Sequence, residues 1–348
     1  MTDRRRHLQA TLRAELEARE ADAFAHVATD RDPTLRYCRV DASDPVAVAF
    51  DGAEWLACRR SDSSDHPAER LAARLRERGL DGSILTPQTV PHDAALYIER
   101  AGFSLASTDA VDHARAEKTP GERERIERAQ AAAGAGLRRA ASVLADATVV
   151  DGSLAVDGDP LTPDRLRRLA DEAVVAAGGF PAGNTAVSAG TDPDVALPAG
   201  EPIVVELAPQ ETDGYHGGLV RTFVVDGDGG WERRAHVAVT RALASARALL
   251  TADEPPTSAV EADLEAEVVA FGFEEGIETA VYSVGLERRE RPADGDAVET
   301  GHVVRLEAAV TGTDGDTVRV ADLLFSRSET AEWLEKPSRS LDPAAFES

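Results

Sequence analysis

Carboxylates and one imidazole lie in or beside short apolar, strand-like runs in the second half of the chain. They are Glu206, His216, Glu307 and Asp322. Carboxylate oxygens and imidazole nitrogens bind the divalent ions that activate water for hydrolysis. If these runs form one sheet, the four side chains could make a metal site, provided that they share a face.

The first third of the chain has alternating helical and strand-like patterns. Leu8, Leu12 and Leu16 repeat every four residues, which predicts one helix face. Asp51-Gly52 separates two apolar runs and predicts a hairpin turn. Further elements are expected at 23–28 (strand), 68–78 (helix) and 83–86 (strand). We therefore predict a small α/β domain over residues 1–115.

The remainder, residues 116–348, is predicted to be a second domain. Thr119-Pro120 and Thr162-Pro163 are helix starts, because threonine caps a helix and proline suits its first position. We then expect strands at 203–207, 219–225, 280–284, 302–310 and 317–325, and helices at 231–250 and 258–271. This order suggests two similar halves of helices and strands.

Six segments of residues 115–330 carry a resemblance to a known family. They are 117–122 (EKTPGE), 183–186 (GNTA), 203–208 (IVVELA), 214–223 (GYHGGLVRTF), 285–292 (GLERRERP) and 301–307 (GHVVRLE). In this order they resemble the pita-bread family of methionine and Xaa-Pro aminopeptidases, prolidases and creatinase. The resemblance implies an α+β fold, with a pita-bread C-terminal domain behind a smaller α/β N-terminal domain.

The family's chemistry uses two divalent ions held by two aspartates, one histidine and two glutamates. The resemblance assigns these five positions, in chain order, to Glu206, Gly218, Tyr282, Glu307 and Ala321. Only two carboxylates therefore survive, and two carboxylates are too few for a catalytic metal. The family's supporting histidines fall on Ala189 and Arg289. Creatinase chemistry, which needs a histidine base, is not supported either.

We interpret the chain as a catalytically inactive relative, a pseudoenzyme without a metal cofactor. The retained cleft would bind a peptide or a small molecule, and its remnant positions are Glu206, Glu307, Tyr282, Arg221, Gly218 and Ala321. The surviving glutamates need counter-charges, for which Arg221, Arg289, Arg305 and Arg319 are candidates. Arg305, two residues from Glu307 on one strand face, is favoured. A salt-bridged core and a pocket for a peptide end or a small cation-bearing ligand stay open as alternatives.

The alternative function is a divergent metal-dependent Xaa-Pro aminopeptidase or dipeptidase. Its rebuilt site would use Glu206, His216, Glu307 and Asp322 with two ions of manganese, cobalt or zinc. Strand side chains alternate between faces, so Asp322 should point away from the site at Ala321 unless a bulge intervenes. Otherwise Asp322 is expected to be a solvated strand acid, and His216 a polar residue near a turn.

The net charge of the chain limits the classes of partner that we expect it to bind. Acidic residues number 63 against 38 basic ones, for a net charge of -25, and only two of the basic residues are lysines. Such a chain disfavours nucleic-acid backbones, and suits molar salt, in which repulsion is screened. We expect a halophilic, cytoplasmic protein with no membrane segment, and a homodimer by resemblance.

Overall fold

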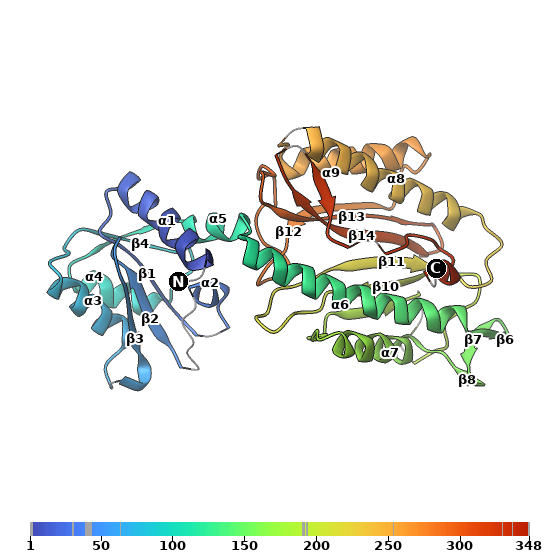
Figure 1. The fold of residues 1–348 in the computed structure, drawn as a ribbon, viewed down its shortest axis with the longest axis horizontal. Helices are drawn as coiled ribbons and strands as arrows, with labels where there is room; N and C mark the ends of the chain where they lie inside the picture. Colours follow the sequence, from blue (N-terminus) through green and yellow to red (C-terminus); the bar gives the residue numbers. More distant parts are fainter. Residues whose placement is uncertain are drawn as a thin grey trace. The chain divides into compact units, whose positions relative to one another are not determined.

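The computed structural model describes residues 3–29, 31–38, 44–62, 64–189, 192, 194–252, 254–328, 330–335 and 337–346. The chain divides into two compact units (Figure 1). One comprises Met1–Arg115 with Thr119–Gly121, and the other Ala116–Lys118 with Glu122–Ser348. No helix in the described ranges is both long enough and apolar enough to cross a membrane.

The first unit contains a five-stranded sheet in the order β3-β2-β1-β4-β5. Its strands are β1 (Ala23–Ala28), β2 (Val46–Phe50), β3 (Trp55–Arg59), β4 (Ser83–Thr86) and β5 (Ser104–Ser107), and its helices are α1 (Asp3–Ala18), α2 (Pro33–Tyr37), α3 (Pro67–Glu77), α4 (His92–Arg100) and α5 (Ala110–Ala116). The predicted strands β1 and β4 and the β2–β3 hairpin are confirmed. Helices α2, α4 and α5 and strand β5 were not predicted. Of these, α4 and β5 bury few apolar side chains.

The second unit is built on a seven-stranded sheet in the order β12-β13-β14-β11-β10-β9, with β15 beside β14. The strands are β9 (Thr185–Ser188), β10 (Ile203–Leu207), β11 (Leu219–Phe223), β12 (Ile277–Ser283), β13 (Val303–Thr311), β14 (Thr317–Ser326) and β15 (Ala331–Trp333). A small separate sheet comprises β6 (Thr148–Val150), β7 (Ser153–Val156) and β8 (Asp159–Pro160). The large sheet is antiparallel throughout its described ladders.

Four long helices accompany this sheet. They are α6 (Pro120–Ala145), α7 (Pro163–Ala176), α8 (Trp231–Ala252) and α9 (Thr257–Ala270). The predicted cap of α7 is confirmed, because the Thr162 side chain accepts a hydrogen bond from the Arg165 amide. All four predicted helices form, and their ends lie within two residues of the predicted ones where both were given.

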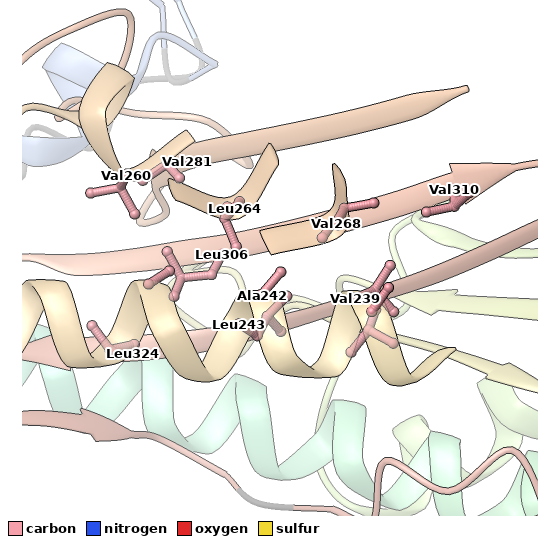
Figure 2. Packing of buried hydrophobic residues seen from close by; sticks show 14 of the residues in the cluster. Val239, Ala242, Leu243, Val260, Leu264, Val268, Val281, Leu306, Val310 and Leu324 are labelled. Atoms are coloured by element: carbon pink, nitrogen blue, oxygen red, sulfur yellow. The ribbon is translucent and has the colours of Figure 1, made fainter. Parts of the chain in front are cut away.

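Two apolar cores join the helices to one face of the sheet. Helices α8 and α9 pack on β12, β13 and β14 through buried aliphatic residues, including Leu243, Leu264 and Leu306 (Figure 2). Helices α6 and α7 pack on β10 and β11 in the same way, through Leu137, Val174 and others. Side chains that alternate with these on the strands must point to the opposite face, which is therefore free to carry polar groups.

Removal of Leu264 tests the larger core. The variant Leu264→Ala deletes a fully buried side chain and should lower the free energy of unfolding by about 2–5 kcal/mol. Val269→Ala on the same helix is the matched control, because Val269 is 45% exposed, and it should have little effect. Denaturant unfolding measures both, and equal losses would contradict the packing described for α9.

Candidate functional site

One row of paired residues crosses the sheet and places two carboxylates on the same face. Glu206 of β10 pairs with Val220 of β11, which pairs with Ala321 of β14, which pairs with Glu307 of β13. Directly paired residues project from the same side of a sheet. Glu206 and Glu307 therefore share the face that the four helices do not cover. Thr222 links β11 to β14, because its hydroxyl accepts a hydrogen bond from the Arg319 amide and donates one to the Arg319 carbonyl.

Two arginines of the same face join the two glutamates. Arg305 Nη2 lies 2.8 Å from Glu307 Oε2 and 3.3 Å from Glu206 Oε1. Arg319 Nη1 lies 2.9 Å from Glu206 Oε2, and its other nitrogens bind Glu307 Oε1. We call these four residues the arginine–glutamate cluster. The favoured pairing of Arg305 with Glu307 is confirmed, and Arg319 is confirmed as a second counter-charge.

The cluster is largely removed from water, which strengthens its ion pairs. The side chain of Arg305 is 3% exposed, and those of Glu206 and Glu307 are 13% and 12% exposed. Burial alone would raise the pKa of Glu307, but Arg305 and Arg319 hold this pKa below its usual range. Burial would lower the pKa of Arg305, yet Glu307, Tyr282 and Glu206 raise it above its usual range. Glu307 and Arg305 are therefore both charged at neutral pH.

Gly218 gives Arg305 the space that it occupies. A Cβ atom at this position would lie 2.8 Å from Arg305 Nη1, closer than real contacts allow. The backbone of Gly218 is held from α6 by the buried Gln130, whose amide accepts from its N–H at 2.7 Å and donates to its carbonyl at 3.2 Å. A guanidinium thus fills the place into which a ligand side chain at position 218 would project.

Aromatic and basic residues border the cluster. Tyr282 pairs with Arg305 across β12 and β13, and its ring lies under the guanidinium groups of Arg305 and Arg289 at 5.9 and 4.9 Å. Arg288, which was not predicted as a partner, donates from Nη2 to Glu206 Oε1 at 3.0 Å. Arg289 instead pairs with Asp294. No strand pattern predicts Arg288, because it lies in the loop after β12.

Arg221 and Asp322 lie on the opposite face of the sheet. Both are one residue out of phase with the row of Val220 and Ala321, so they point towards the helices. They form an ion pair of 2.6 Å in which each side chain is 1% exposed. Asp322 also binds Arg339 at 2.7 Å. Arg221 was predicted at the cleft and Asp322 as a solvated acid, and the structure corrects both.

His216 is committed to internal hydrogen bonds. Its Nε2 lies 2.9 Å from the Gln210 side-chain amide, and its Nδ1 lies 3.4 Å from the Ala208 carbonyl. Its backbone N–H donates to Gly285 O. Since both ring nitrogens have partners in the chain, His216 serves the packing of its loop rather than a ligand. The structure thus joins Glu206 with Glu307, and leaves His216 and Asp322 with other partners.

The donor set does not fit a two-ion centre. Gly218 and Ala321 carry no ligand atom, and the oxygens of Glu206 and Glu307 already bind guanidinium groups. Among the residues that the structure describes, no group of three or more histidine, cysteine, aspartate or glutamate side chains could hold a metal ion. In this arrangement the oxygens of both glutamates are occupied by hydrogen bonds from arginines.

A known protein family and several solved structures match this chain. The model of metallopeptidase family M24 matches residues 124–326, more than half of the chain. No curated protein matches the sequence. Solved structures with the same α+β pita-bread fold include a prolidase from Pyrococcus furiosus (17% identity, TM-score 0.73, covering 94% of this chain and 100% of that one) and the Xaa-Pro dipeptidase from Bacillus anthracis (16%, 0.78, 97% and 99%). The dipeptidase PepE from Mycobacterium ulcerans is similar (20%, 0.72, 97% and 96%).

The depressed pKa of Glu307 predicts a pH dependence of stability. Ionised Glu307 stabilises the fold above its unfolded pKa of 4.5, and this contribution is lost as the pH falls through the lower folded pKa. Glu307→Gln should therefore cost about 3 kcal/mol at neutral pH, a cost that shrinks below about pH 4. Urea unfolding of both proteins across this range measures the difference. Glu332→Gln, which alters an exposed pair with Arg327, is the control. A pH-independent difference for Glu307→Gln would contradict the assignment.

The buried pair on the helix-covered face predicts a large loss of stability. Asp322→Asn leaves the Arg221 guanidinium buried without its carboxylate and should cost about 3–5 kcal/mol. Asp294→Asn removes an exposed carboxylate that is also paired with an arginine, and should leave unfolding unchanged. If the two variants unfold at the same denaturant concentration, the proposed role of the buried pair is incorrect.

Proposed function

The chain belongs to metallopeptidase family M24, and we propose that it is a non-catalytic member that uses the arginine–glutamate cluster to bind a peptide or a small ligand. The observation that carries the proposal is the Arg305 guanidinium, which fills the space beside Gly218 and binds both surviving glutamates. The similarity to prolidases and Xaa-Pro dipeptidases supports peptides as the ligand class.

Hydrolysis by a metal-activated water needs a cation that can lower the pKa of that water. A guanidinium stays protonated and acts only as a hydrogen-bond donor and a fixed charge. Glu307 is a poor general base, because its depressed pKa leaves the carboxylate weakly basic and its oxygens accept hydrogen bonds from arginines. These properties support binding without turnover.

The alternative is a metal-dependent Xaa-Pro aminopeptidase or dipeptidase with a rebuilt site. Such a site would require Arg305 and Arg319 to leave the glutamates, and would need ligands from elsewhere. Asp322 is engaged with Arg221 and Arg339 on the other face, and His216 with Gln210 and Ala208. The geometry therefore supports the non-catalytic proposal over this alternative.

Metal analysis combined with a peptidase assay tests the proposal. The purified protein, incubated with manganese, cobalt or zinc and then freed of excess ion, should retain less than one equivalent of metal. It should not hydrolyse Xaa-Pro dipeptides. The prolidase from Pyrococcus furiosus, treated in parallel, controls for the assay.

Stoichiometric metal together with turnover would overturn the proposal, provided that Glu307→Gln abolishes both. That variant serves as the matched control, because a contaminating peptidase would give the same rate in either preparation. Turnover that is unchanged by Glu307→Gln therefore belongs to a contaminant and leaves the proposal in place.

A further inference from the structure

We infer that β9 binds an extended, uncharged peptide segment as an added strand, through the backbone groups of Thr185 and Val187. The inference rests on the proposed function, because it specifies how the protein holds a peptide beside the arginine–glutamate cluster. β9 is the last strand of the large sheet, and it pairs only with β10. Its other side is therefore an edge, where backbone groups are open to another strand.

The register of the ladder shows which backbone groups face this edge. The Ala208 amide donates to the Asn184 carbonyl, so the backbone of Asn184 faces β10. Alternate residues of an antiparallel strand face the same neighbour, and Thr185 and Val187 therefore direct their N–H and C=O groups away from β10. These groups have no hydrogen-bond partner among the described residues. The hydroxyl oxygen of Thr185 is also buried without a described partner.

Two other edge strands of the chain are closed by side chains. In β12 the Val281 amide donates to the Glu261 carboxylate of α9 at 2.9 Å. In β3 the Ala57 carbonyl accepts from the Arg74 guanidinium of α3 at 3.1 Å. In the described ranges β9 has no such cap, and its sequence contains neither the charge nor the proline that keeps edge strands apart. This edge is therefore available for pairing.

The segment around β9 lacks the charges that cover the rest of the chain. Residues 173–189 contain no acidic or basic side chain, although 29% of all residues are charged. Within this run Val175 and Phe180 are 58% and 52% exposed. Phe180 precedes β9, and its backbone exchanges two hydrogen bonds with Gln210, which follows β10. Exposed apolar side chains in one uncharged segment are typical of a contact surface.

The partner that fits this edge is a peptide rather than a second copy of the chain. Two copies would bring together net charges of -25 each, whereas an uncharged peptide meets no such repulsion. The edge also continues the row of paired residues that carries the site, because Ala186 pairs with Glu206. An added strand would be the next member of this row. Since Ala186 is small and exposed, a peptide side chain beside it has room on the face of the cluster.

Amide hydrogen exchange of the full chain, measured by NMR with a synthetic peptide, tests the inference. The probe is the pentapeptide acetyl-Ser-Val-Thr-Val-Ser-amide, which is uncharged and favours an extended conformation. Without peptide, the amides of Thr185 and Val187 should exchange rapidly, whereas those of Ala186 and Ser188 are protected by β10. At saturating peptide the first two amides should exchange at least about tenfold more slowly, and the other two should be unchanged.

Two N-methylated versions of the same peptide are the matched controls. Methyl groups on the second and fourth residues, or on the first, third and fifth, block alternate sides of an extended chain. An added strand uses only every second amide. One methylation pattern should therefore weaken binding at least about tenfold in calorimetric titration, and the other should leave it nearly unchanged.

A proline substitution removes the edge donor from the protein itself. Val187→Pro should weaken binding about tenfold, while the ladder to β10 keeps its hydrogen bonds because this N–H faces away from it. Val149→Pro is the matched control. Val149 is 43% exposed on the edge strand β6, and its N–H faces outward because Val150 and Ser153 flank the turn and form the bonded pair. This variant should bind the peptide normally, and urea unfolding checks that both variants fold.

The inference is overturned if the peptide does not bind, if both methylation patterns weaken binding equally, or if the bound peptide leaves exchange at Thr185 and Val187 unchanged. Equal binding by folded Val187→Pro and Val149→Pro would also overturn it. Should Val187→Pro not fold, the measurements on the unaltered chain decide. Protection of the two amides that rises with protein concentration, without peptide, would assign the edge to a second copy of the chain instead.

None of these outcomes involves metal or turnover. A failure here therefore leaves the proposed loss of hydrolysis standing. Turnover that Glu307→Gln abolishes would overturn that proposal, whatever the peptide does at β9.

Discussion

The row of paired residues that runs from Glu206 through Val220 and Ala321 to Glu307 determines the chemistry of the second unit. It places two carboxylates on one face of a sheet whose other face is buried under helices. Two such charges repel each other unless cations lie between them. Arg305 and Arg319 supply these cations from the same strands. The repulsion between Glu206 and Glu307 is thus offset by arginine side chains of the sheet itself, without a bound ion.

The opposite face of the sheet also contains a buried charge, which is stabilised by an ion pair and by backbone carbonyls. Arg221 is buried between the two apolar cores, where burial lowers its pKa and Asp322 opposes that effect. Its remaining donors bind the carbonyls of Val220, Ala321 and Ser338. The C-terminal segment is thus tied to the centre of the sheet, where Arg339 adds a second ion pair to Asp322. A buried charge is tolerable only when its hydrogen bonds are satisfied in this way.

Much of the fold and part of the candidate site could be predicted from the sequence, because they depend on local patterns of residues. Strand alternation placed Asp322 away from Ala321, and the spacing of Arg305 and Glu307 predicted their pairing. Tertiary contacts could not be predicted in this way. The burial of Asp322 depends on Arg221 and Arg339, which are distant in sequence, and the role of Arg288 depends on a loop that crosses to β10. The fit of Arg305 beside Gly218 requires the positions of both strands.

The choice of arginine explains why two side chains suffice at the cluster. Each guanidinium reaches both glutamates at once, since its several N–H groups point in fixed, divergent directions. A lysine ammonium is a single point charge on a flexible stem, and would satisfy one carboxylate well and the other poorly. Only two of the 38 basic residues in this chain are lysines, and the described one, Lys118, binds one carboxylate in a buried pair. Where two carboxylates must be joined across the four strands β10, β11, β14 and β13, a planar cation with divergent donors suits the geometry.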